Sequence, residues 1–278
     1  MGGVILFDRN MESADQTKKL IADLQAKADQ KVPLFIGVDE EGGQVVRGKS
    51  FLTPPPSEQE IGRSGEVTRA EESARQTAEK LKKLGFNVNF APVADVGEYA
   101  RSFSADPEQA AKFVEAAAQG YEQQHMMYAL KHFPGIGRGT VDSHEDISSI
   151  TATKAELLKR DIVPFQKVID ERQSEDYFVL VSQAIQTDFL RGELGYRGLI
   201  ITDDVEMGAL AKHYSFRELG VKAVEAGSDI VLVCHEYPHE TDVYLGLLDA
   251  VEDGTIPMER VDESVRRIVK AKLLHAQS

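Results

Sequence analysis

Short apolar runs alternate with longer amphipathic stretches along the whole chain. The apolar runs are almost continuous in Val, Ile, Leu and Phe, which is typical of parallel strands buried on both faces. The stretch Lys154–Arg172 repeats apolar residues at helical spacing, and a second helix is expected from about Glu108 to Gln124, after an Asp-Pro start signal. The pattern predicts strands at Gly3–Phe7, Leu34–Val38, Val88–Ala91, Tyr128–Lys131, Phe178–Val181, Leu199–Thr202 and Ile230–Val233.

This strict alternation predicts an α/β fold with a parallel sheet, closed as a (β/α)8 TIM-type barrel or open and doubly wound. No G-x-G-x-x-G motif follows an early strand, so the dinucleotide-binding version lacks its usual support. The pattern contains seven strands rather than eight. A barrel would therefore lack, or not show, its first strand, and the abrupt start at Gly3 places that strand before it. We expect residues 1–278 to form a single domain.

Composition narrows the classes of partner. The net charge is −14 and no stretch is densely basic, so nucleic acid is not an expected partner, whereas a small neutral or weakly charged ligand is compatible. Cys234 is the single cysteine, which excludes an internal disulfide or a thiolate metal cluster. No apolar run approaches the roughly 18–20 residues of a membrane span, and we expect a soluble chain. Oligomeric state and localisation are not readable from these features.

Polar residues gather directly after four of the predicted strands. Asp39, Asp95, Lys131 with His132, and Asp203 each come at or just beyond the end of an apolar run. In a barrel these positions share the carboxyl-terminal rim, where barrel enzymes build their active sites. This convergence is stronger evidence for a catalytic site than any one of the residues.

Each of these residues also has a plainer interpretation. An Asp at the end of a strand often caps the following helix, so Asp204 could cap while Asp203 points toward the barrel axis. Asp142 and His144 are close enough for the carboxylate to hold an imidazole nitrogen, which suits general acid–base work, but such a pair also occurs on surface loops. A metal site of His132, Asp142 and His144 would match no well-defined ligand spacing.

The segment Asp39–Gly43, together with Arg47, offers carboxylates and a guanidinium on one loop. Sugar hydroxyl groups need both donors and acceptors, and paired acidic and basic side chains supply them. The alternative is a solvated, salt-bridged loop, and Arg101 carries no signal by itself.

Taken together, these stretches resemble glycoside hydrolase family 3, specifically its bacterial β-N-acetylglucosaminidase (β-N-acetylhexosaminidase) branch. The resemblance covers nearly the whole chain and keeps the order of the motifs. Its signature loop is similar to Lys131–Gly135 followed by Asp142–His144, and other family segments are similar to Asp39–Gly43, Asn89–Val93 and Ile201–Asp204.

The resemblance implies a retaining two-step displacement. Asp203 would be the nucleophile, and His144, oriented by Asp142, would protonate the leaving oxygen and then deprotonate water. The substrates would be muropeptides or short chitin-type oligosaccharides ending in β-linked N-acetylglucosamine, and no cofactor or metal is implied. The positions expected to bind the sugar ring are those of Asp39, Arg47, Arg101, Lys131 and His132.

The chain departs from the family pattern in three places. Ile136 replaces a second histidine of the signature loop, the first barrel strand is not seen before Gly2, and a loop after Ser182 is short. Three other functions therefore stay open at this level: a β-N-acetylglucosaminide phosphorylase, a catalytically weak sugar-binding descendant, and a metal-dependent barrel hydrolase.

Overall fold

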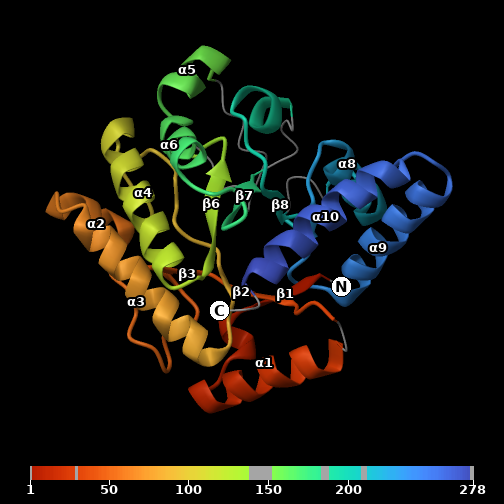
Figure 1. Cartoon of the computed structure of the whole chain (residues 1–278), viewed down its shortest axis with the longest axis horizontal. Coiled ribbons are helices and arrows are strands. Elements are labelled where there is room, and N and C mark those ends of the chain that lie inside the picture. Colours follow the sequence, from red (N-terminus) through yellow and green to blue (C-terminus); the bar gives the residue numbers. More distant parts are fainter. Residues whose placement is uncertain (1, 29–30, 138–151, 183–187, 208–211, 276–278) are drawn as a thin grey trace.

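A curled sheet of parallel strands forms the centre of the molecule, with helices packed around its outer side (Figure 1). The computed structural model describes residues 2–28, 31–137, 152–182, 188–207 and 212–275. Within them the sheet has seven strands in the order β1-β2-β5-β6-β7-β8-β9. Their bounds are β1 Gly3–Leu6, β2 Phe35–Val38, β5 Val88–Asn89, β6 Met127–Phe133, β7 Tyr177–Val181, β8 Leu199–Asp204 and β9 Ile230–Leu232.

The strand order decides between the two folds that the sequence left open. Every neighbouring pair is parallel, and the order of the strands across the sheet is the same as their order along the chain. A doubly wound sheet reverses its strand order at a switch point, and this sheet does not. The barrel prediction is confirmed as a half-barrel, whose end strands in the described residues are β1 and β9.

Most connections between strands contain a helix, as the alternation predicted. The helices are α1 Ala14–Ala28, α2 Glu58–Ser64, α3 Thr68–Leu84, α4 Pro107–Gln123, α5 Lys154–Lys159, α6 Val163–Glu171, α8 Phe216–Glu225, α9 Tyr237–Glu252 and α10 Met258–His275. Short helical turns occupy Asp8–Asn10 and Asp188–Glu193, and a small hairpin joins β3 (Glu40–Gly42) to β4 (Val45–Val46).

The prediction of one helix over Lys154–Arg172 was wrong. The segment forms two helices, α5 and α6, which are separated at Arg160–Ile162. The cause is Pro164, which has no N–H to donate and whose ring excludes the carbonyl of the residue four positions earlier. Pro164 instead lies in the first turn of α6, where a missing N–H needs no partner.

Alternate residues of each strand serve two apolar layers. On β6, Tyr128 and Leu130 belong to the large cluster under the helices, whereas Met127 and Ala129 belong to a smaller cluster on the inner face of the curl. Helix α10 packs at the amino-terminal end of the half-barrel, where Lys272 donates to the carbonyl of Gly2 and Ala271 joins the smaller cluster. The carboxyl-terminal ends of the strands are left for the polar residues.

Candidate active site

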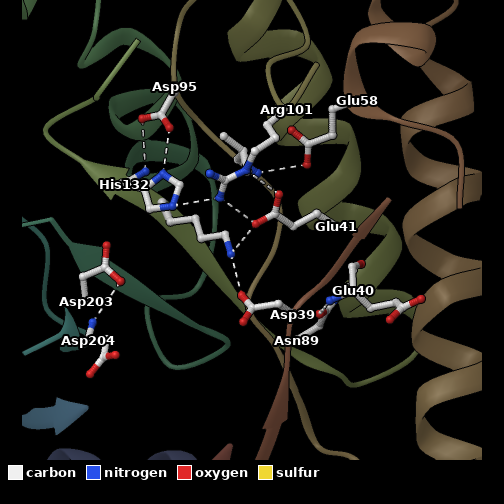
Figure 2. Close-up of polar contacts among 12 residues, drawn as sticks. Asp39, Glu40, Glu41, Glu58, Asn89, Asp95, Arg101, His132, Asp203 and Asp204 are labelled. Atoms are coloured by element: carbon white, nitrogen blue, oxygen red, sulfur yellow. Dashed lines mark hydrogen bonds and ion pairs between the residues drawn. The ribbon is translucent and has the colours of Figure 1, made fainter. Parts of the chain in front are cut away.

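The polar residues that follow the strands lie at the carboxyl-terminal end of the sheet (Figure 2). Asp39 follows β2, Lys131 and His132 are in the last half of β6, and Asp203 and Asp204 end β8. Parallel strands bring their carboxyl ends to one edge, so segments far apart in sequence meet here. Asp39, Lys131 and His132 form one connected group with three further residues, Glu41, Asp95 and Arg101, and we call these six residues the paired cluster.

Lys131 is the centre of the paired cluster. Its Nζ lies 2.7 Å from Asp39 Oδ1 and 2.6 Å from Glu41 Oε1. Arg101 also binds the Glu41 carboxylate, and its Nε and Nη2 each donate to one carboxylate oxygen at 2.8 Å. The Lys131 and Glu41 side chains are only 4% and 2% exposed. This arrangement satisfies both oxygens of a buried carboxylate with charged donors, the geometry in which such pairs are strongest.

The electrostatics of the cluster hold its charges in place. Burial alone would raise the pKa of Glu41, but Lys131 and Arg101 outweigh it and lower that pKa to about 2. Burial likewise opposes the charge on Lys131, and the carboxylates of Asp39 and Glu41 outweigh it and raise the pKa of Lys131. Both groups therefore stay ionised across the ordinary pH range, as donors and acceptors of fixed position.

His132 connects this group to Asp95. Its Nδ1 lies 2.8 Å from Asp95 Oδ2, and its Nε2 lies 3.1 Å from Arg101 Nη2. A guanidinium can only donate, so Nε2 accepts and Nδ1 carries the hydrogen that is donated to Asp95. Asp95 also accepts from Tyr99 and from the backbone N–H of His132 and Ile136. The contacts thus fix one neutral tautomer of His132.

The hairpin that carries Glu41 is held by Asn89 of β5. Asn89 accepts from the N–H of Glu40 at 3.0 Å and donates to the Glu40 carbonyl at 3.1 Å. The Glu40 carboxylate then accepts from the N–H of Arg47 and Gly48. This frame orders the turn, but it directs the Arg47 guanidinium to the ring of Phe7, 5.3 Å from its centroid, rather than into the paired cluster.

Asp203 has a different environment from the paired cluster. Its Oδ1 accepts the N–H of Asp204 at 2.9 Å, and in the described residues no Lys, Arg or His nitrogen forms an ion pair with it. Asp204 pairs with His235 at 3.1 Å and accepts from the N–H of Glu206. Burial, followed by the nearby carboxylates of Glu206 and Asp203, raises the pKa of Asp204, while the backbone N–H of Glu206 and the side chain of His235 oppose that rise.

Cys234, just after β9, lies near carboxylates from both sides of the site. Burial raises the pKa of its thiol most, followed by the carboxylates of Asp204, Asp39, Asp203 and Glu206. Asp39 belongs to the paired cluster on β2 and Asp203 to β8, so the β9 end that carries Cys234 lies within electrostatic reach of both. An acid without a cation and a set of fixed donors and acceptors thus share one end of the sheet.

The structure brings together four of the predicted site residues and leaves others apart. Asp39, Arg101, Lys131 and His132 form contacts with one another, directly or through Glu41, and Arg47 does not join them. Asp142 and His144, the predicted acid–base pair, lie outside the described residues. Within the described part of the chain, no group of three or more His, Cys, Asp or Glu side chains could hold a metal ion.

Two members of the cluster were not selected from the sequence. Glu41 appeared only as part of an acidic run, and Asp95 only as the polar end of a strand segment. The signal for Asp95 was its position, since it follows β5 as Lys131 and His132 end β6.

Every helix in the described ranges is too short or too polar to cross a membrane.

Comparison with known proteins places these features in a family. Residues 1–271 match the family described as "Glycosyl hydrolase family 3 N terminal domain". The chain belongs to glycosyl hydrolase family 3. A "Beta-hexosaminidase A" of Pseudoalteromonas piscicida is 30% identical, over 100% of this family 3 chain and 54% of that protein. A "Beta-hexosaminidase" of Haemophilus influenzae is 33% identical, over 85% of the chain and 73% of that protein.

Solved structures agree with the family. A family 3 β-N-acetylglucosaminidase from Paenibacillus sp. superposes with a TM-score of 0.94 and 34% identity, over 99% of this family 3 chain and 57% of that one. The predicted family and its branch of relatives are therefore confirmed. The chain spans about half the length of the first of these curated relatives.

Proposed function

We propose that this chain is a retaining exo-β-N-acetylglucosaminidase that releases terminal β-linked N-acetylglucosamine. The observation that supports this best is the position of Asp203, an acid without a cationic partner in the described residues, at the same end of the sheet as the paired cluster. Membership of family 3 and the names of the relatives support the same reaction class. We propose further that residues 1–278 act as one domain.

Asp203 would act as the nucleophile. A carboxylate oxygen attacks the anomeric carbon, the bond to the leaving oxygen breaks, and a covalent glycosyl-enzyme forms. A carboxylate already paired with Lys or Arg would be a weaker nucleophile, because its charge is stabilised before the reaction starts. Among the described residues Asp203 carries no such pair, and its Oδ1 accepts only the Asp204 N–H there, so no described donor occupies the other oxygen.

The paired cluster would hold the sugar ring through the hydrogen-bonding groups that its internal contacts do not use. Lys131 uses two of its three N–H groups on Asp39 and Glu41. Among the described residues no hydrogen bond reaches Asp39 Oδ2 or Arg101 Nη1. An acceptor and two donors therefore remain beside one another, which is the combination that neighbouring sugar hydroxyls require.

The second proton-transfer group would be His144, oriented by Asp142. Both residues lie outside the described ranges, so this assignment is based on the similarity of the sequence to the family's signature loop. A neutral imidazole would not repel an ionised Asp203, and its protonated form can give a proton to the leaving oxygen before taking one from water. The natural substrates would be muropeptides or short chitin-type oligosaccharides.

The test is release of nitrophenol from the aryl β-N-acetylglucosaminide, measured with and without phosphate and beside the β-glucoside. Turnover of the N-acetyl sugar that needs no phosphate would support the proposal. Strict dependence on phosphate would instead support a phosphorylase, in which phosphate resolves the glycosyl-enzyme. Tight binding of the sugar without turnover, by folded protein, would indicate a binding descendant and overturn the proposal.

A further inference from the structure

Glu58, the first residue of α2, lies buried beside the paired cluster without belonging to it (Figure 2). The residue is 4% exposed. Its Oε1 accepts the backbone N–H of Val93 at 2.9 Å, and its buried Oε2 has no hydrogen-bond partner in the described part of the chain. Across the described ranges, no Lys, Arg or His nitrogen lies within ion-pair distance of this carboxyl group. A buried carboxylate with one amide donor and no cation would be costly.

The charge balance around Glu58 also opposes ionisation. The paired cluster contains three carboxylates, on Asp39, Glu41 and Asp95, and two cations, on Lys131 and Arg101, while the contacts of His132 keep its ring neutral. Both cations are already paired with Asp39 and Glu41, while Asp95 is held by His132 and by neutral donors. A fourth negative charge next to Glu41 would add repulsion to the cost of desolvation. The uncharged acid avoids both, because its carbonyl oxygen still accepts from Val93.

Val93 is where Glu58 acts on the site. Val93 forms an isolated parallel bridge with Lys131, and the N–H of the next residue, Ala94, donates to the Lys131 carbonyl at 2.6 Å. Asp95 follows directly and holds His132. A second contact from the start of α2 reaches the same region, since the N–H of Gln59 donates to Ala100, the neighbour of Arg101.

We propose that Glu58 is an uncharged, protonated positioning residue, which fixes Val93 and thereby the placement of Lys131 and the Asp95–His132 pair. The titratable groups near it are Glu41 from the hairpin, Lys131 from β6, Tyr99 and Arg101 from the loop after β5, and Tyr121 from α4. Burial raises the pKa of Glu58 well above its ordinary range, and Glu41 adds to that rise. The N–H of Val93 and the two cations only partly oppose it.

The first test is the pH dependence of unfolding in Glu58→Gln. A group that keeps its proton when folded and loses it when unfolded makes unfolding easier as pH rises above about 4.5. Glutamine has no such proton. The unfolding constant of the variant, relative to the unmodified protein, should therefore fall by up to about tenfold for each pH unit between pH 5 and pH 7.

The matched control is Glu60→Gln, two residues along the same helix. Glu60 is ionised, because its carboxylate accepts from the N–H and hydroxyl of Ser57, which lower its pKa. For Glu60→Gln, the unfolding constant relative to the unmodified protein should therefore rise with pH, so that this variant is destabilised more at pH 7 than at pH 4. If Glu58→Gln behaves like this control, Glu58 is ionised and the proposal is wrong. If Glu58→Gln does not fold, the uncharged amide does not replace the acid, and the proposal is overturned as well.

The second test separates positioning from simple packing and rests on the proposed function. Glu58→Ala removes the acceptor for Val93 and should raise KM for the aryl N-acetylglucosaminide several-fold. Glu58→Gln keeps the acceptor and should restore most of the loss. Equal KM values in both variants and the unmodified protein would overturn the positioning role. The unfolding experiment needs no sugar, so its outcome stands even if the chain turns over no substrate.

Discussion

Two regions at the same end of the sheet handle their acidic residues in opposite ways. In the paired cluster, on the β2 and β6 side, all three carboxylates have a charged or histidine partner within 2.8 Å. On the β8 side, Asp203, Asp204 and Glu206, which we call the acidic cluster, have in the described residues only the histidines His235 and His239 as ion-pair partners.

This difference matches the binding role proposed for the paired cluster and the chemical role proposed for Asp203. Fixed pairs such as Lys131 with Glu41 keep donors and acceptors in one geometry, which suits recognition of a rigid ring. An acid that must form a bond to carbon needs a charge that is not already neutralised, and among the described residues Asp203 has no ion-pair partner. If the comparison is right, substitutions on the two sides should fail in different ways, one through the catalytic rate and the other through folding and binding.

The largest effect is expected for Asp203→Asn. The amide cannot form the glycosyl-enzyme, so kcat should fall by roughly 10³-fold or more. The midpoint of thermal unfolding should change little, because Asp203 has no ion pair to lose in the described residues. Nitrophenol release from the aryl N-acetylglucosaminide and a parallel melting curve measure both. A kcat close to that of the unmodified protein would contradict the assignment of the nucleophile.

Lys131→Met should fail through folding. Methionine leaves the half-buried Asp39 without its cation and the buried Glu41 with Arg101 alone, and breaking a buried pair from one side costs about 3–5 kcal/mol. Denaturant unfolding at pH 7 measures this cost. The loss should shrink below about pH 4, where the carboxylates of the variant take up protons. A cost of less than about 1 kcal/mol, the value of a surface pair, would remove the contrast between the regions.

Asp95→Asn comes next, because all four of its neighbours are donors. The carboxylate accepts from two backbone N–H groups, from Tyr99 and from His132 Nδ1. An amide nitrogen must face donors in either orientation, and if it faces Nδ1 the ring is driven to the other tautomer, whose Nε2–H points at Arg101. We expect a loss of about 1–3 kcal/mol in unfolding free energy and a raised KM.

The imidazole signals of His132 provide the check on this explanation. Nitrogen-15 shifts should report hydrogen on Nδ1 in the unmodified protein and a changed tautomer in Asp95→Asn. Unchanged shifts together with unchanged KM would show that Asp95 does not set the tautomer.

The sequence predicted the parts of the molecule that depend on local pattern. Strands such as Leu199–Thr202 are buried on both faces, so their apolar runs are nearly continuous and easily recognised. The β3–β4 hairpin was missed because its residues Glu40 and Glu41 are charged yet buried. Hydropathy cannot indicate that burial, since it depends on Asn89 and Lys131, which are distant in sequence.

The same reason separates the site residues that were predicted from those that were not. Asp203 and Lys131 stand at strand ends, a position visible in the pattern. Glu58 begins a helix and follows a capping Ser57, so its local sequence indicates only a helix start, and Glu60 is the acid that completes the cap. The contact that gives Glu58 its role is with Val93, which only the tertiary fold brings near.

The smallest effect is expected for His235→Ala, and it tests whether the acidic cluster depends on its partner. The His235 side chain is 52% exposed, and solvent screens its pair with Asp204. Asp204 keeps its contact with the N–H of Glu206, so unfolding free energy should change by less than about 1 kcal/mol. Since His235 opposes the rise in the pKa of Asp204, its removal should raise that pKa further. Carboxyl carbon-13 titration of the variant measures the shift, and a destabilisation as large as that of Lys131→Met would show that both regions depend on buried pairing.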